Sequence, residues 1–323
     1  MTIANARKPW VMPNSLPGAA TASATEILRM AARDDFGGVL FSSMFALSER
    51  LDEAEVRAAR ELADDLGLTL AASLWQLSPL IPGRARDALA AGDGVLLDGL
   101  ERLVRVAAAS GIRDLMCMVG SLDDRTHPTI AWADQLAATR ALFDRIAPLL
   151  RDLGCRLSVK THEELSSFEL ARLIEGHDDV LFVALDPVNS LCRMENPLAA
   201  ARRLAGRISL LHVDDAVLRF EEDGSMRRFL ASVGKGILDW QGMLDVAPGA
   251  VVVLDLHRGQ FAMPVFDGEW LAQQEGIGVA EYAGLIRHAL RFGKADIPWD
   301  QAAPQSRYAD ARKVVARMAA GRR

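Results

Sequence analysis

Short apolar runs recur along the chain at intervals of roughly 25 to 45 residues, and a helical pattern lies between one run and the next. This alternation is typical of βαβ units, in which helices join parallel strands and cover the sheet. Eight such units can close into a (β/α)8 barrel. The predicted strands are Trp10–Asn14, Gly38–Ser42, Leu68–Leu74, Asp114–Val119, Cys155–Thr161, Val180–Leu185, Ile208–Asp214 and Ala250–Leu256.

The joints between helices and strands support this prediction. A glycine stands after a helical segment and before a strand, where a helix end favours a left-handed residue. Asp52 with Glu55 has the spacing of a capping box, and Pro197 suits the first turn of a later helix. The glycines at these joints are Gly67, Gly111, Gly154, Gly176 and Gly206.

An open, doubly wound sheet is the alternative fold, and it usually carries a glycine-rich turn after an early strand. The sequence has no GxGxxG or Walker motif. The segment VGKGILDW, Val233 to Trp240, follows a predicted long loop and lacks P-loop spacing. Two interpretations stay open for it: a turn into a helix capped near Asp239, or a phosphate contact.

The chain of 323 residues, half of them hydrophobic, can bury a sizeable core. We predict a single domain, with the barrel in residues 1–300 and a C-terminal helical extension in residues 301–323. One face of this helix carries four apolar positions, which would pack on the barrel or on a second subunit of a homo-oligomer. They are Tyr308, Ala311, Val315 and Met318.

The charge pattern points to a small soluble ligand. The formal net charge is −6 without a block of like charges, which argues against nucleic-acid and membrane partners. The basic pair Arg7 and Lys8 is not followed by an apolar run long enough for a signal peptide. Three cysteines without CxxC spacing indicate neither a disulfide framework nor zinc. We therefore expect a cytoplasmic protein in a reducing compartment.

Polar residues stand at the carboxyl ends of the later strands, where a barrel holds its chemistry. Lys160, Asp186 and His212 are 26 and 26 residues apart, so βα units of equal length would bring them to the same depth. Asp255 lies near the end of the eighth predicted strand. A buried ion pair without catalysis is the competing interpretation for each residue. Because side chains alternate along a strand, residues two positions apart lie on the same face. Three sets of polar residues have this spacing: Ser158, Lys160 and His162; His212 and Asp214; Asp255 and His257.

The segments LSVKTHEE, ALDPVN, LLHVDD, GKGILDW and VVVLDLH resemble the strand five to eight blocks of the xylose isomerase-like superfamily. This resemblance implies a barrel enzyme of carbohydrate metabolism. The superfamily includes sugar and sugar-phosphate isomerases and epimerases, dehydratases and type IV apurinic endonucleases. The endonuclease branch is disfavoured, because Ser42, Ser43, Ser73 and Trp75 occupy the regions of its extra zinc-binding histidines.

The resemblance also implies a divalent metal, Mn or Mg, held by a carboxylate, an aspartate, a histidine and a glutamate on strands five to eight. Asp186 and His212 match two of these ligands, and Asp255 takes the place of the glutamate. Lys160 stands where the first carboxylate would be, and an ammonium cannot bind a cation. Two outcomes stay open: His257, Glu163 or Glu164 replaces the missing ligand, or the lysine replaces the metal.

Isomerisation and epimerisation remove a proton next to a carbonyl and stabilise an enediolate. We expect Lys160, Asp255 and His212 to carry this chemistry, with Lys160 acting as a base or in place of a metal. A dehydratase or lyase, and a non-catalytic barrel that binds a sugar or a partner, are the alternatives. The loops Asp215–Val233 and Arg258–Trp270 are expected to cover the site. The expected substrate contacts are His162, Asn189, His257, Trp75 and Arg258.

Overall fold

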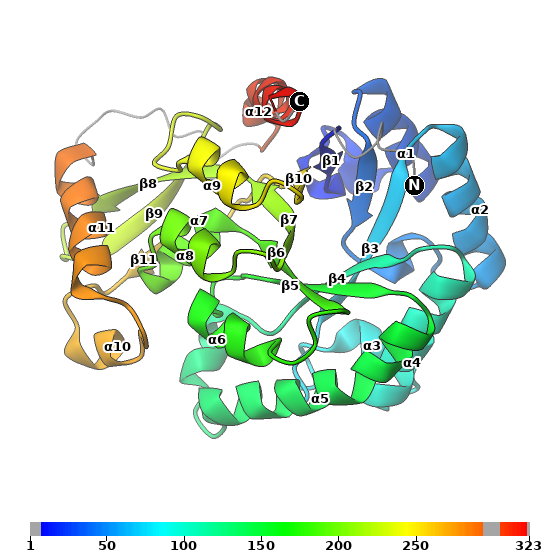
Figure 1. Cartoon of the computed structure of the whole chain (residues 1–323), viewed down its shortest axis with the longest axis horizontal. Helices are drawn as coiled ribbons and strands as arrows, with labels where there is room; N and C mark the ends of the chain where they lie inside the picture. The colour runs from blue at the N-terminus through cyan, green and yellow to red at the C-terminus, as the bar shows by residue number, and fades with distance from the viewer. Residues whose placement is uncertain (1–7, 293–303, 322–323) are drawn as a thin grey trace.

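The computed structural model describes residues 8–292 and 304–321. Within them, eight parallel strands close a barrel in the order β1-β10-β7-β6-β5-β4-β3-β2, as Figure 1 shows. The predicted fold is therefore confirmed. The barrel strands are β1 (Trp10–Val11), β2 (Gly38–Phe41), β3 (Thr69–Gln76), β4 (Asp114–Met118), β5 (Arg156–Lys160), β6 (Leu181–Leu185), β7 (Ile208–Val213) and β10 (Val251–Leu254).

Helices follow the strands and surround the barrel (Figure 1). Each glycine at the five predicted joints has a positive φ, as a left-handed helix end requires. The longer helices are α1 (Ala24–Arg33), α2 (Glu53–Asp65), α4 (Leu96–Ala109), α5 (Trp132–Asp152), α11 (Val279–Phe292) and α12 (Pro304–Ala320); the shorter ones are α3 (Arg86–Ala91), α6 (Ser167–Leu173), α7 (Pro187–Ser190), α8 (Pro197–Arg203), α9 (Trp240–Val246) and α10 (Gly268–Ala272).

Helix starts and a strand end follow from local chemistry. Asp52 caps α2 by accepting from the backbone N–H groups of Ala54 and Glu55. The Glu55 side chain does not complete a capping box and instead accepts a hydrogen bond from Ser48. The first strand is shorter than predicted because Pro13 begins the 3-10 turn Pro13–Ser15. The 3-10 turns are η2 (Pro13–Ser15), η3 (Ala19–Thr21), η4 (Met44–Ala46), η5 (Leu122–Thr126) and η6 (Leu191–Arg193).

The barrel interior is filled by side chains from the strands. A larger apolar core lies between the strands and the helices. Because side chains alternate along a strand, the next inward positions of β5, β7 and the segment after β10 lie above this interior layer. Those positions are polar, and they form the site described below. The interior layer consists of Trp10, Met12, Leu40, Ala71, Met116, Ala184, Leu210 and Val253.

The two long loops predicted over the site contain a small antiparallel sheet. The strands β8 (Asp215–Phe220) and β9 (Met226–Ala231) form a hairpin, and β11 (Phe261–Met263) pairs with β9. Gly224 has a φ of 83°, which suits the tight turn between β8 and β9. The prediction that VGKGILDW follows a loop was therefore wrong, since β9 precedes it. Figure 1 shows this sheet beside the barrel, with α11 next to it.

The C-terminal helix α12 packs on the barrel. Tyr308, Ala311 and Val315 are buried in the main apolar core, and Met318 packs against it. These contacts support the prediction that the apolar face of this helix packs on the barrel. The expected boundary between residues 300 and 301 lies outside the described residues. No helix in the described ranges has the length and apolarity to cross a membrane. All three cysteines are free and buried.

Candidate active site

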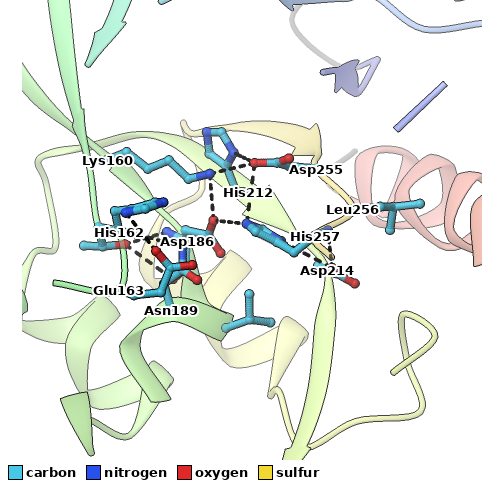
Figure 2. Close-up of polar contacts among 12 residues, drawn as sticks. Lys160, His162, Glu163, Asp186, Asn189, His212, Asp214, Asp255, Leu256 and His257 are labelled. Carbon is cyan, nitrogen blue, oxygen red and sulfur yellow. Dashed lines mark hydrogen bonds and ion pairs between the residues drawn. The ribbon is translucent and has the colours of Figure 1, made fainter. Parts of the chain in front are cut away.

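Four predicted residues meet at the carboxyl ends of adjacent strands. Lys160 ends β5, Asp186 follows β6, His212 lies near the end of β7 and Asp255 follows β10. Their exposed fractions are 5%, 0%, 0% and 2%. Figure 2 shows their polar groups pointing toward one another. The convergence expected from the spacing of 26 residues is thus present in the structure.

The Lys160 ammonium joins the two aspartates. Its Nζ donates a hydrogen bond to Asp255 Oδ2 at 2.7 Å and forms an ion pair with Asp186 Oδ2 at 2.9 Å. Burial alone would lower the pKa of Lys160, but the two negative charges outweigh it and hold this pKa above its usual value. The amine is therefore a cation at neutral pH. This favours the charged role of Lys160 over the role of a base.

His212 is oriented by Asp255. Its Nδ1 lies 2.9 Å from Asp255 Oδ2, so Nδ1 carries the proton and donates it. Nε2 is buried and has no hydrogen-bond partner among the described residues. Burial and the nearby Lys160 charge lower the pKa of His212, although Asp255 acts against them. His212 is thus a neutral imidazole whose free Nε2 can accept a proton.

His257 lies between two carboxylates. Its Nε2 is 2.8 Å from Asp186 Oδ2, and its Nδ1 is 3.3 Å from Asp214 Oδ2. The backbone N–H of His257 donates to the same Asp214 oxygen at 2.7 Å. Burial would lower the pKa of His257, but Asp186 and Asp255 raise it to about 10. The site therefore has two cations, Lys160 and His257, beside the neutral His212.

Asp186, His212 and Asp255 together offer donor atoms that could hold a metal ion. These donor atoms lie within 4.8 Å of one another. Hard divalent cations bind carboxylate oxygens at about 2.0 to 2.6 Å. The Lys160 ammonium already contacts one oxygen of each aspartate, so a divalent ion on those oxygens would meet a like charge. With Lys160 in this position, the residues do not fit the metal that the resemblance implies.

His162, Glu163 and Glu164 form a second cluster next to this site. His162 Nδ1 lies 2.8 Å from Glu163 Oε2 and 2.7 Å from Glu164 Oε2. Both glutamates are buried, although they lie beyond the end of β5. The two charges overcome the effect of burial and raise the pKa of His162 to about 10. The sequence offers Glu163, Glu164 and His257 as a replacement metal ligand. In the structure the two glutamates turn toward His162, while His257 contacts Asp186.

The other predicted substrate contacts lie in different environments. Asn189 is fully buried, accepts from Arg228 Nη1 at 2.7 Å and donates to the Thr161 carbonyl at 3.3 Å. Trp75 has a φ of 65° at an irregularity of β3, and the Arg86 guanidinium lies 3.9 Å from the centre of its ring. Arg258 is exposed. Substrate contacts at these residues stay predictions.

Two residues at the site were not predicted from the sequence. Asn14 is exposed, yet its Nδ2 donates to Asp255 Oδ1 at 3.1 Å, so solvent reaches the edge of the site there. Arg307 on α12 contacts Asp214 Oδ1 at 2.6 Å. For Asn14, the only signal was an amide at the end of the first predicted strand. Nothing in the sequence connects Arg307 with residues more than 90 positions earlier.

The GKG segment is a structural turn. Asp215 is buried and accepts hydrogen bonds from the backbone N–H groups of Ala216 and Gly234. A Cβ atom on Gly236 would lie 1.9 Å from Asp215 Oδ1, so only glycine fits there. Asp239 caps α9 by accepting from Gly242 N–H. These contacts account for the segment as a turn into a capped helix.

Comparison with known proteins supports the fold. Residues 28–247 match the model of the family described as xylose isomerase-like TIM barrel. A stretch of 95 residues is 27% identical to the uncharacterized protein YihM of Escherichia coli strain K12. This stretch spans 29% of each protein, so the chain matches less than a third of the length of this relative.

Solved structures with the same fold include two epimerases and a dehydratase. D-psicose 3-epimerase from Clostridium cellulolyticum H10 gives a TM-score of 0.61 at 12% identity, over 89% of this chain and 98% of that one. L-ribulose 3-epimerase gives 0.60 at 16% identity, over 98% and 95%. The probable 3-DHS dehydratase AsbF of Bacillus anthracis gives 0.54 at 13% identity, over 77% and 92%.

Proposed function

The chain belongs to the xylose isomerase-like TIM barrel family, and we propose that it is an isomerase or epimerase of a sugar or sugar phosphate. The reaction would proceed by proton abstraction next to a carbonyl. The observation that carries this proposal is the buried Lys160 ammonium between Asp186 and Asp255, beside the free Nε2 of His212. A positive charge and a base at one site are what enediolate chemistry requires.

Lys160 takes the role that a metal would otherwise have. Its ammonium contacts the two aspartates that the resemblance assigns as metal ligands, at 2.9 and 2.7 Å. A cation fixed in a buried site stabilises a developing oxyanion more strongly than it would in water. We infer that the substrate carbonyl oxygen approaches Lys160 and that the enzyme needs no divalent metal.

His212 is the proposed base. In the first step, the C–H bond next to the carbonyl breaks and its proton moves to Nε2. The electron pair of that bond forms the C=C bond of the enediolate, and the carbonyl oxygen takes the negative charge. Return of a proton to the same carbon from the opposite face gives the epimer. Return to the former carbonyl carbon gives the isomer, provided that the hydroxyl proton of the neighbouring carbon moves to the former carbonyl oxygen so that the new carbonyl forms. Asp255 holds Nδ1 and so keeps Nε2 available.

Asp255 is better suited to position these groups than to act as the base itself. Burial would raise its pKa, but Lys160, His257 and His212 hold the pKa of Asp255 well below its usual value. A carboxylate stabilised in this way takes up a proton poorly. The proton that returns to the second face would come from His257, which is cationic and lies 2.8 Å from Asp186.

A dehydratase is the second candidate. The same enediolate can expel a neighbouring hydroxyl group if an acid protonates it, and the cationic His257 is such an acid. The two activities differ in their products, since elimination releases water and leaves a product 18 mass units lighter, about the mass of one water molecule. A non-catalytic sugar-binding barrel would give neither product.

The test is solvent deuterium exchange in chelator-treated protein. A panel of ketoses, ketose phosphates and keto acids is incubated in D2O and followed by NMR and mass spectrometry. Deuterium next to the carbonyl together with a new stereoisomer or isomer supports the proposal, and loss of water supports the dehydratase. Binding of a panel member with neither exchange nor elimination would indicate a non-catalytic barrel and overturn both.

A further inference from the structure

The C-terminal helix α12 contributes a buried arginine to the edge of the site. Arg307 is 7% exposed. Its Nη1 lies 2.6 Å from Asp214 Oδ1, and its Nη2 donates to the backbone carbonyl of His257 at 2.6 Å. A longer bond of 3.4 Å joins Nη1 to the Ala231 carbonyl. One guanidinium therefore connects the segments that follow β7 and β10 with the last residue of β9.

Asp214 connects Arg307 with the imidazole of His257. The carboxylate is fully buried, and its two oxygens face different partners. Oδ1 accepts from Arg307 and from the backbone N–H of Asp215, while Oδ2 accepts from the backbone N–H of His257 and contacts Nδ1. Arg307 thereby fixes the rotation of Asp214 and supplies the positive charge that balances it.

The other side of the His257 ring faces the reacting groups. Its Nε2 lies 2.8 Å from Asp186 Oδ2, which also contacts Lys160 (Figure 2). The ring orientation is set by Asp214 on one side and Asp186 on the other. Because Arg307 holds both Asp214 and the His257 carbonyl, it constrains the side chain and the backbone of His257 together.

We propose that Arg307 is a positioning residue, which holds the His257 imidazole in its working orientation through Asp214. The helix α12 is then part of the active site and not only a cover for the barrel. This inference rests on the proposed function for its effect on turnover. Its structural part concerns His257 alone and is testable without a substrate.

The helix has other contacts that hold it on the barrel. Ala311 and Val315 are fully buried, the Tyr308 hydroxyl donates to Asp34 Oδ2 at 2.5 Å, and Arg312 forms an ion pair with Asp34 at 3.3 Å. A substitution of Arg307 should therefore leave α12 docked. Arg312→Gln is a matched control, since it removes an ion pair of the same helix that does not touch the site.

The experiment measures the imidazole nitrogen signals of His257 by NMR in protein labelled with 15N-histidine. The signals are assigned by their absence in His257→Gln. We expect Arg307→Gln to shift both His257 nitrogens, and Arg307→Lys to shift them less because a lysine still reaches Asp214. Arg312→Gln should leave them unchanged. Identical His257 signals in wild type and Arg307→Gln, or equal shifts in Arg312→Gln, would overturn the inference.

Turnover gives a second readout once the deuterium exchange panel has identified a substrate. Arg307→Gln should lower kcat on the order of 10- to 100-fold, as expected for a displaced reacting group, and change KM little. A larger effect on KM than on kcat would contradict a positioning role. If no substrate is found, the proposed function fails, while the His257 signals still decide the role of Arg307.

Discussion

Lys160 Nζ donates a hydrogen bond of 2.7 Å to Oδ2 of Asp255, inside a barrel where both side chains are almost fully buried. The same Asp255 oxygen is 2.9 Å from His212 Nδ1. A charge at the centre of the site and the orientation of its base thus depend on one carboxylate oxygen.

Lys160→Met should destabilise the fold strongly at neutral pH. Without the ammonium, Asp186 and Asp255 remain buried next to each other with less positive charge between them. Removal of one partner from a buried ion pair costs about 3 to 5 kcal/mol. Urea unfolding at pH 7 measures this change, with the exposed Lys235→Met as the control. Equal stability of Lys160→Met and wild type would contradict a charge balance between Lys160 and the two aspartates.

His212→Asn should abolish most of the turnover while the fold is retained. Loss of a general base typically costs about 100- to 10,000-fold in rate. The readout is deuterium exchange into the substrate, with circular dichroism as the check on folding. His177→Gln, which loses a surface contact with Asp144, serves as the control. Full exchange activity in His212→Asn would exclude this histidine as the base.

Asn14→Leu should reduce turnover more than stability. The side chain is exposed, and its amide donates to the charged Asp255 Oδ1 at 3.1 Å and, over a longer distance of 3.4 Å, to the Leu256 carbonyl. Loss of one such bond to a charged group costs about 1.5 to 3 kcal/mol at most. We expect a lower kcat because Asp255 can rotate and release His212. An unchanged kcat, measured together with the midpoint of thermal unfolding, would argue against this role.

Glu195 should make the protein less stable as the pH rises. It is fully buried, and burial raises its pKa to about 7 despite hydrogen bonds from Ser167 and a contact with Arg203. The folded pKa exceeds the usual value of 4.5, so its contribution to stability is greatest below pH 4.5 and is lost as the pH passes 7. The full effect is about 3 kcal/mol.

Glu195→Gln removes this titration. Urea unfolding at pH 5 and pH 8 should show a smaller loss of stability in Glu195→Gln than in wild type. The exposed Glu175→Gln is the control and should keep the wild-type difference. The same loss between pH 5 and pH 8 in wild type and Glu195→Gln would assign the pH dependence to other groups.

The barrel and the convergence of the main candidate residues were predictable because both follow periodic rules. Strand periodicity and the glycine joints predict the fold, and the equal spacing of Lys160, Asp186 and His212 predicts their convergence. The ion pairs of Lys160 were not predictable in detail, because two outcomes were open for the metal. The structure favours the ammonium, since its position conflicts with a cation on the same oxygens.

The residues missed by the sequence act across long separations or from irregular segments. Arg307 reaches Asp214 only because α12 returns to the barrel, and no local pattern encodes that contact. The sequence predicts a loop where the hairpin β8–β9 lies, although Asp223 and Gly224 form a turn between two alternating segments. Glu163 and Glu164 lie beyond the end of β5 and are nevertheless buried, where His162 pairs with both.

The most direct test is the metal content of the wild-type protein and of Lys160→Glu, by plasma mass spectrometry after incubation with Mn²⁺ and gel filtration. We predict no stoichiometric metal in wild type and near-stoichiometric metal in Lys160→Glu, where a carboxylate joins Asp186, His212 and Asp255. Lys235→Glu is the control for added surface charge. One tightly bound metal ion per wild-type chain would contradict the claim that Lys160 replaces the metal.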